Sequence, residues 1–341
     1  MAWWIRFVSL CLMTKAREIV TRLEAVIGVD GAPVRLVSII EIQLVEHFGL
    51  SAIEAAEKAE QCSSQVSRLI FKRLAESETA GTSPVLNIVG STLDTVVGFC
   101  YVLPTDQSSI AGKKQQRIHI DTLLKKIKAI TFSEFELFGK RILEELGAGQ
   151  ATVTPHGNDQ GIDFFGQFSF GQLSDVPRPF LQLAHDVKLL FAGQAKHYPN
   201  RAISTSVVRE LIGAISLART KTFSSDGIDI FGDLDMRPFS PVVTLLFTTG
   251  TFSSGALHLA ASAGIIAKSG EQLAVFLADR GVGMVRGASG VVFDEAAFER
   301  WLSGDSIDDE NGIVNESRSV KANGLQRQSK ESSCLVSSLE G

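Results

Sequence analysis

The spacing of apolar residues after position 130 predicts helices and strands in alternation. Ser133 is placed to cap a helix over 134–146, and Gly147 would end it. Apolar and polar residues alternate along 161–170 and again along 187–198, which predicts two strands with one apolar and one polar face each. A shorter strand begins near Ala151 and turns at 155–158. The apolar stripe of the helix consists of Phe135, Phe138, Ile142 and Leu146, and Glu136 lies off it.

The pattern continues in the same way towards position 285. A helix is predicted over 204–219, and an almost wholly apolar run over 242–248 is typical of a strand buried on both faces. Helices over 253–263 and 271–279 enclose a short strand over 264–267. This order of elements is that of an α/β domain with a central mixed sheet flanked by helices.

Residues 15–105 are predicted to be mostly helical. One helix would end at Gly49, Ser51 would cap a second over 52–59, and Ser63 or Ser64 would cap a third. Two β-prone runs, 85–89 and 95–103, follow. Three short helices and a hairpin are the order of a winged-helix domain, which would read DNA. A helical domain that mediates self-association fits the same pattern, and both interpretations stay open.

The remaining segments carry opposite charge. Residues 106–130 are expected to form a basic linker, which suits either phosphate contact or a solvated surface. Residues 286–341 are acidic and Ser-rich, with only 291–302 able to form a helix, so we expect them to be largely disordered. We therefore divide the chain into an N-terminal domain (15–105), a linker (106–130), an α/β domain (131–285) and a tail (286–341).

Composition narrows the class of protein. With 341 residues, 45% of them hydrophobic, the chain can bury the cores of two domains. A net charge of −5 argues against a protein that coats nucleic acid through bulk charge. The four cysteines are widely spaced, so they predict neither a zinc site nor a disulfide framework and favour a cytoplasmic protein.

No segment predicts a membrane helix. The apolar run over 1–13 is interrupted by Arg6 and is too short to span a bilayer. Its flanking charges follow the run instead of preceding it, which disfavours a signal peptide. We expect either a short helix packed on the body or a true start at Met13.

Candidate chemistry lies on the polar faces of the two long predicted strands. Gln194 and Lys196 are two residues apart, so they point the same way, and Asp163 can meet them if the strands pair. Phosphodiester hydrolysis needs a hard cation with oxygen ligands, which Asp163 and Gln194 can supply. Lys196 can stabilise the phosphate charge, and Glu136 could hold water around the metal. On spacing alone, such residues more often only form a polar surface.

The histidines and arginines near these positions give little evidence for further metal or phosphate ligands. His156, His185 and His197 do not follow a zinc-binding spacing, and we expect them on the surface or in loops. On a regular strand His197 should face away from Lys196. Arg201 and Arg209 suit a helix surface or a phosphate contact.

Several motifs in the expected order resemble the catalytic domain of the Mrr-type restriction endonucleases, a branch of the PD-(D/E)xK superfamily. The resemblance covers about 132–285. The motifs are the Phe135–Glu136 pair ahead of Leu146–Gly147, the turn over 158–163 that ends in Gly-Ile-Asp, Gln194-Ala195-Lys196 as Gln-x-Lys, the helix over 208–214, and the segment 248–253 followed by Ala256.

The resemblance implies Asp163, Gln194 and Lys196 as the catalytic set, with Glu136 as a weaker fourth member. It also implies Mg²⁺ or Mn²⁺ as cofactor, DNA as substrate and defence against foreign or modified DNA as the setting. A double-strand cut needs two active sites or one that acts twice, which is compatible with a homodimer. The alternatives are a DNA repair or junction-resolving nuclease, and a catalytically inactive DNA-binding or assembly protein with a nuclease fold.

Overall fold

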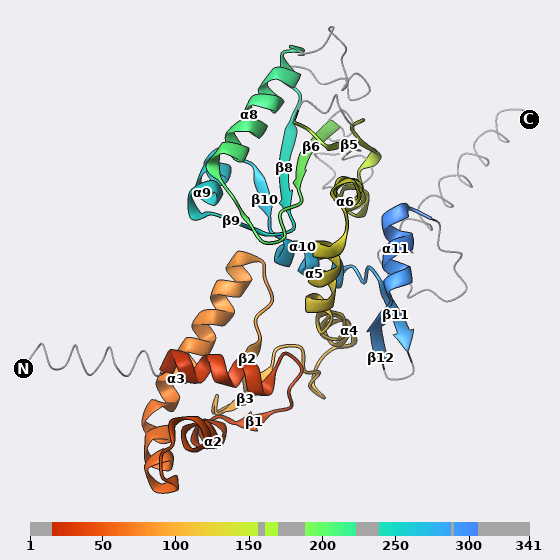
Figure 1. Ribbon diagram of the computed structural model, residues 1–341. Coiled ribbons are helices and arrows are strands. Elements are labelled where there is room, and N and C mark those ends of the chain that lie inside the picture. Colours follow the sequence, from red (N-terminus) through yellow and green to blue (C-terminus); the bar gives the residue numbers. More distant parts are fainter. Residues whose placement is uncertain (1–15, 156–160, 170–187, 223–238, 288–289, 306–341) are drawn as a thin grey trace, which may run out of the picture.

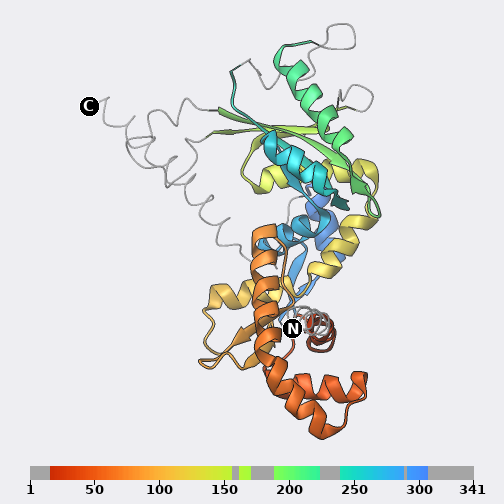
Figure 2. The ribbon, with the colours of Figure 1, turned by 90° about the vertical axis from the view of Figure 1, so that its left-hand side faces the viewer.

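The computed structural model describes residues 16–155, 161–169, 188–222, 239–287 and 290–305 (Figure 1). His156, His185, half of the predicted turn over 158–163, and residues 288–289 and 306–341 of the acidic tail lie outside the described residues. The described chain forms a smaller N-terminal part and a larger α/β part, which Figure 2 shows one above the other.

The α/β part is built on a five-stranded sheet, as the sequence predicted. Its strand order is β10-β8-β6-β5-β4. The pairs β6–β8 and β8–β10 are parallel, whereas β4–β5 and β5–β6 are antiparallel, so the sheet is mixed. The strands are β4 (Gly149–Val153), β5 (Phe164–Ser169), β6 (Lys188–Lys196), β8 (Val242–Thr248) and β10 (Ile266–Lys268).

Helices cover both faces of this sheet (Figure 1). On one face α8 (Thr205–Arg219) and α9 (Ser254–Ser262) pack over Leu190, Ala192 and Leu246. On the other face lie α5 (Ile120–Ala129), α6 (Phe132–Glu145) and α10 (Gly270–Asp279), whose core includes Ala195 and Phe247. Helices α8, α9 and α10 begin within one residue of their predicted starts. Burial on both faces explains the apolar run in β8.

After β6 and again after β8, a short strand leads into a helix of the first face. Strand β7 (Ala202–Ile203) pairs in parallel with β9 (Thr251–Phe252), and α8 and α9 follow directly. This ribbon places the starts of both helices beside the carboxyl ends of β6 and β8.

The first turn of α6 differs from the prediction. The N-cap is Thr131, not Ser133, because Glu134 completes a capping box with Thr131. The backbone N–H of Thr131 donates to the Glu134 carboxylate, and this bond is the main reason that the pKa of Glu134 lies below its usual value. The helix therefore starts two residues earlier than expected.

The predicted face of one strand was also wrong. Ile162 and Phe164 were expected to share a face, but Ile162 packs against α8 and Phe164 packs against α6. Regular pairing begins only at Phe164, and the Asp163 N–H donates to the carbonyl of Gly193, the residue that pairs with Phe164. This irregular step interrupts the alternation of side chains.

The segment predicted as a basic linker is helical and belongs to the α/β part. It forms α4 (Ser108–Arg117) and α5, and α5 buries Ile120, Leu123 and Ile127 in the core. Because its apolar residues recur at helical spacing, burial outweighs the surface charge of the segment.

The predicted start of the tail, at residue 286, was likewise too early. Residues after 285 complete a hairpin, β11 (Met284–Gly287) with β12 (Gly290–Phe293), followed by α11 (Glu295–Ser303). Phe298, Trp301 and Leu302 are buried in the same core as α6. The domain therefore continues to at least Ser303, because this helix supplies part of its core.

The N-terminal part contains a helix over residues 16–27, β1 (Val34–Arg35), α2 (Leu36–Phe48), α3 (Ala52–Ala80) and a hairpin of β2 (Leu86–Val89) with β3 (Thr95–Gly98). Three helices and a hairpin are present, in the order expected for a winged helix. The short strand β1 joins the hairpin through β3.

The three helices are not the three that were predicted. The first, over residues 16–27, was not singled out, although Ala16, Ile19, Val20 and Leu23 have helical spacing. The second and third predicted segments fuse into α3. The Ser63 hydroxyl donates to the carbonyl of Glu60, 2.8 Å away, so its polar group is satisfied inside the helix and does not start a new one.

Candidate active site

Asp163 lies at the point where the pairing of β5 with β6 stops. Its carboxylate Oδ2 accepts a hydrogen bond from the backbone N–H of Ala195 at 2.7 Å. The side chain thus accepts the hydrogen bond that a backbone carbonyl would accept if the β5–β6 ladder continued on the N-terminal side of Phe164. Since Ala195 separates Gln194 from Lys196, the Asp163 carboxylate meets β6 between the two other predicted residues.

Gln194 and Lys196 share a face of β6, as predicted. The neighbouring positions on that face, Leu190 and Ala192, pack against α8, whereas Phe191 and Ala195 lie on the α6 side. The amide of Gln194 lies beside Gly161, whose positive φ of 85° turns the chain just ahead of Asp163. Lys196 is the last residue of β6 and is half-buried, so it lies at the edge of the sheet.

Glu136 approaches from the other layer. It lies in α6 and is only 3% exposed, although it was placed off the apolar stripe. Helix α6 covers the face opposite to α8, so the route from Glu136 to the other residues passes around the end of the sheet. The Asp163 carboxylate, which binds a backbone N–H, lies near the plane of the sheet at that end.

The carboxyl end of β8 supports Lys196. In the parallel register Lys196 pairs with Thr248, which is fully buried. The Thr249 N–H donates to the Lys196 carbonyl at 3.4 Å, and the Gly250 N–H donates to the Thr248 hydroxyl at 3.2 Å. A side chain at Gly250 would collide with the carbonyls of Tyr198 and Arg201. The glycine therefore lets the turn after β8 pack directly against the segment that follows Lys196.

Buried polar atoms without hydrogen-bond partners gather near these residues. Among the described residues such atoms include Gln194 Oε1, Thr154 Oγ1, Thr249 Oγ1 and His197 Nε2. Leaving a buried polar atom unpaired costs about 1–3 kcal/mol, so each of them favours an additional polar partner. Within the described part of the chain, no three His, Cys, Asp or Glu side chains come together as a metal site.

Thr154 was not among the residues predicted from sequence. It is 2% exposed, and its backbone N–H donates to the carbonyl of Asp163 at 2.9 Å. Its position directly before the predicted turn over 155–158 was the one available signal, and a single threonine there is too common to be informative.

His197 behaves as expected for its position. It lies on the α6 side of β6, where its ring meets Phe135 edge-on with 6.1 Å between centroids. It therefore faces away from Lys196. Arg201 lies over the ring of Tyr198, and Arg209 reaches the hydroxyl of Thr205.

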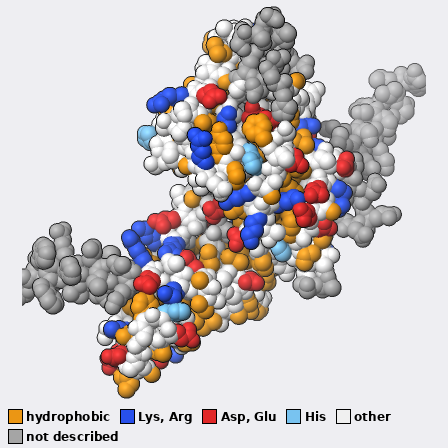
Figure 3. Space-filling model, in the orientation of Figure 1, with side chains coloured by type: hydrophobic (Ala, Val, Ile, Leu, Met, Phe, Trp, Pro, Cys, Tyr) orange, Lys and Arg blue, Asp and Glu red, His pale blue; other side chains and the backbone are white. Residues whose placement is uncertain are grey.

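Three of the six basic residues of α4 and α5 are paired with acidic ones. Lys114 pairs with Asp106 at 2.8 Å, Arg117 pairs with Asp279, and Lys126 pairs with two glutamates of α11. On the face in Figure 3, basic and acidic side chains are interspersed. For these three residues, ion pairs within the protein would compete with phosphate contact, one of the two interpretations left open for this segment.

A cavity of about 280 Å³ lies elsewhere, in the N-terminal part, between the helix over residues 16–27, α3 and β2. Its lining includes Glu24, Arg73 and Pro84 and none of the four predicted catalytic residues. Among the described helices, none combines the length and apolar character needed to cross a membrane.

Comparison with solved structures gives a match to the MspJI restriction endonuclease in complex with a 27-mer oligonucleotide. The two chains are 19% identical, with a TM-score of 0.32. The alignment covers 63% of this chain and 41% of the other, so this chain spans less than half of that protein's length. Such a TM-score is too low to establish a common fold. No curated protein sequence matches this chain.

The model of a known family matches residues 127–224, a segment that contains Glu136, Asp163, Gln194 and Lys196. That family is the Mrr catalytic domain, described as restriction endonuclease. The match covers less than half of the chain and includes α6, β4, β5, β6 and α8. The resemblance of this chain to the Mrr-type restriction endonucleases is thereby confirmed for residues 127–224.

Proposed function

We propose that this protein is a metal-dependent DNA endonuclease of the restriction type. Asp163, Gln194 and Lys196 would form its catalytic set, with Glu136 as an accessory group. The observation that carries the proposal is the hydrogen bond from the Ala195 N–H to the Asp163 carboxylate. It places the Asp163 carboxylate against the backbone between the other two residues, although 31 positions separate Asp163 from Gln194 (194 − 163) in the sequence.

The residues fit a hard divalent cation such as Mg²⁺ or Mn²⁺. Such ions prefer carboxylate and carbonyl oxygens. Asp163 supplies a carboxylate whose Oδ2 is already oriented, and the carbonyl oxygen Oε1 of Gln194 is buried without a protein partner. A bound cation would satisfy that oxygen and would offset the burial of the carboxylate.

The protein's own groups would act on the phosphate as follows. Lys196 brings a positive charge to the sheet edge, where it can stabilise the negative charge that develops on the phosphate during attack. Asp163 and Gln194 are 3% and 1% exposed, so their electrostatic interactions are weakly screened by water. When bound, the cation would supply Lewis acidity and lower the pKa of an attacking water.

The test is cleavage of plasmid DNA prepared with and without base methylation, in the presence of Mg²⁺ or Mn²⁺. We expect Asp163→Asn and Lys196→Ala to lower the cleavage rate by about 100-fold or more, the usual loss when a charge-stabilising group is removed. Chelation of the metal should abolish cleavage by the wild-type protein.

Lys188→Ala is a matched control. Lys188 lies on the same strand and is exposed at its opposite end, so this variant should cut at the wild-type rate. Cleavage that persists unchanged in both Asp163→Asn and Lys196→Ala would refute the site. DNA binding by the wild type without cleavage under every metal condition would favour an inactive assembly protein, and preference for branched substrates would favour repair.

The N-terminal part is proposed to contact the DNA. Its element order suits a DNA-reading module, and the C-terminus of α3 lies against the N-terminus of α10 (Figure 2), where Gln272 donates to the Ala80 carbonyl. Helix α10 follows β10, one of the parallel strands whose carboxyl ends share the sheet edge with Lys196. DNA held by this part would therefore lie near that edge.

A further inference from the structure

The hydroxyl of Thr154 is buried without a partner, on a residue whose backbone is hydrogen-bonded to that of Asp163. The Thr154 side chain is 2% exposed and its Oγ1 lacks a hydrogen-bond partner. The backbone of the same residue donates to the Asp163 carbonyl at 2.9 Å, so the two residues are neighbours across the β4–β5 pair. A threonine hydroxyl is both a donor and an acceptor, and valine would fill the same space without that requirement.

The surroundings explain what this hydroxyl lacks. Asp163 donates its N–H to Gly193 and accepts at Oδ2 from Ala195, so its backbone and one carboxylate oxygen serve the sheet. The side-chain oxygen Oε1 of Gln194, two residues from Lys196, is another buried oxygen without a partner. Two unpartnered oxygens on residues next to Asp163 in the sheet are the donor types that a hard cation, or water held by one, would satisfy.

We infer that Thr154 is a further positioning residue of the cation site, and that its hydroxyl serves a divalent cation directly or through a buried water. The inference rests on the proposed function, since it assumes that Asp163 and Gln194 hold the cation. It adds Thr154, the residue directly after β4, to Asp163, directly before β5, and to Gln194 and Lys196 at the end of β6. It also accounts for a polar side chain at a buried position that would otherwise favour an apolar one.

The inference predicts that one substitution weakens cation binding without destabilising the metal-free protein. Thr154→Val removes the hydroxyl and keeps the shape. It should weaken Mn²⁺ binding by about 10-fold or more, the usual effect of losing a group that supports a metal ligand. The metal-free variant should melt at the same temperature as the wild type or higher, because a buried hydroxyl without a partner is lost. Thr154→Ser should restore the binding.

The experiment is calorimetric titration of the full-length protein with Mn²⁺, together with thermal melting in the presence and absence of Mn²⁺. Asp163→Asn reports on the cation site itself. Gln43→Met is the matched control, because Gln43 is 1% exposed in α2 and its Oε1 is also without a partner. That variant should bind Mn²⁺ as the wild type does.

The outcomes are distinguishable. Weaker binding in Thr154→Val, with binding restored in Thr154→Ser, supports the inference. Wild-type affinity in Thr154→Val together with lost affinity in Asp163→Asn overturns the inference and leaves the proposed function in place. Absence of Mn²⁺ binding by the wild-type protein overturns the proposed cation site and the role of Thr154 with it.

Discussion

At the scale of single residues, the candidate site depends on close packing behind it. Phe164 directly follows Asp163, and its ring stacks on Phe247 with 5.3 Å between centroids. Gly193 and Gly139 leave the space that this ring occupies, since a Cβ at either position would collide with it. The glycine at 193 thus allows β5 and β6 to pair closely up to the step at which Asp163 turns towards Ala195.

Gly193→Ala should therefore destabilise the protein by about 1–3 kcal/mol, the typical cost of overpacking a core. Urea denaturation followed by circular dichroism measures this change. It should also lower the cleavage rate. The Phe164 ring would have to move, and Asp163, the preceding residue, would move with the backbone of Phe164.

Gly213→Ala provides the opposite control. Gly213 lies exposed within α8, and an added Cβ there meets nothing within 4 Å. Replacing it with alanine should stabilise the protein by about 0.5–1 kcal/mol, because alanine has a higher helix propensity than glycine. Equal effects of the two substitutions would show that the Phe164 ring does not constrain position 193.

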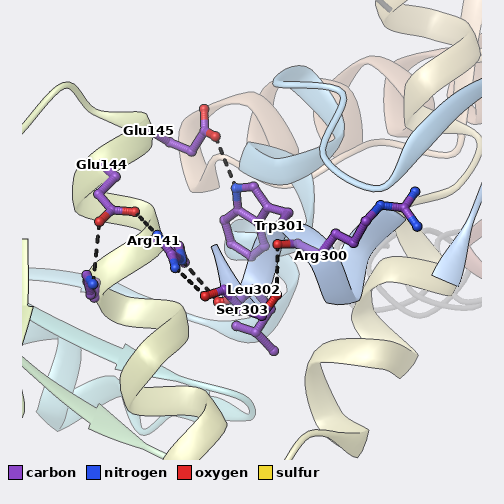
Figure 4. A network of polar contacts seen from close by, with 8 residues as sticks. Arg141, Glu144, Glu145, Arg300, Trp301, Leu302 and Ser303 are labelled. Atoms are coloured by element: carbon purple, nitrogen blue, oxygen red, sulfur yellow. Dashed lines mark hydrogen bonds and ion pairs between the residues drawn. The ribbon is translucent and has the colours of Figure 1, made fainter. Parts of the chain in front are cut away.

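At the scale of elements, α11 secures α6, the helix that carries Glu136. The Arg141 guanidinium donates to the carbonyls of Leu302 and Ser303 at 3.0 and 2.6 Å, and the Trp301 indole N–H donates to the Glu145 carboxylate at 3.0 Å (Figure 4). These bonds satisfy carbonyls at the C-terminus of α11 that the helix itself leaves unpaired. Helix α11 is thus an integral part of the α/β domain.

A chain that ends after Val285 should lose the fold of this domain, because the buried Phe298, Trp301 and Leu302 leave with the deleted segment. Soluble yield and the cooperativity of thermal unfolding measure this loss. A chain that ends after Asp305 retains every contact of α11 named above and should unfold cooperatively. Cooperative unfolding of the shorter chain at the temperature of the longer one would contradict the role assigned to α11.

At the scale of the whole molecule, α10 links the two parts. At its N-terminus the Gln272 side chain accepts from the Ser269 N–H at 2.8 Å and donates to the Ala80 carbonyl at the end of α3. Near its C-terminus Asp279 forms two hydrogen bonds with Arg117 of α4, at 2.6 and 2.8 Å. This pairing raises the pKa of Arg117. The N-terminal part is therefore oriented relative to the candidate site by the contact at the N-terminus of α10, while the Arg117–Asp279 pair holds α4 against the other end of the helix.

Gln272→Glu separates the two roles of that side chain. A carboxylate still accepts from the Ser269 N–H, so α10 keeps its cap. It cannot donate to the Ala80 carbonyl, and its charge is repelled by the negative end of the α3 dipole. We expect faster hydrogen exchange at the end of α3 and a larger radius of gyration in solution scattering, with little change in the stability of the α/β domain.

Glu271→Gln tests whether charge near the start of α10 is enough to produce this effect. Glu271 is the preceding residue, and burial, followed by the nearby Asp121, raises the pKa of its carboxyl. Its substitution leaves the contact between Gln272 and Ala80 intact and should leave the scattering profile unchanged. An unchanged profile for Gln272→Glu would contradict the proposed link.

Periodicity predicted the elements of the α/β domain well where burial is uniform. The run in β8 and the stripes of α8 and α10 follow directly from it, because a strand or helix with a fixed buried face repeats its apolar residues at a fixed interval. The helices α4 and α5 were mistaken for a linker because charge was given more weight than the apolar positions 120, 123 and 127. The placement of Thr154 beside Asp163 left no periodic signal.

The sequence by itself determined the order of elements, the shared face of Gln194 and Lys196, and the motifs that resemble a nuclease family. These properties are local, since they depend on residues a few positions apart. Only the tertiary structure decided that the Asp163 carboxylate reaches the backbone between Gln194 and Lys196, that Thr154 pairs with the backbone of Asp163, that α11 completes the α/β domain, and that α10 contacts the end of α3. Those contacts connect residues far apart in the chain, and their geometry depends on an irregular strand step and on packing, neither of which leaves a repeat in the sequence.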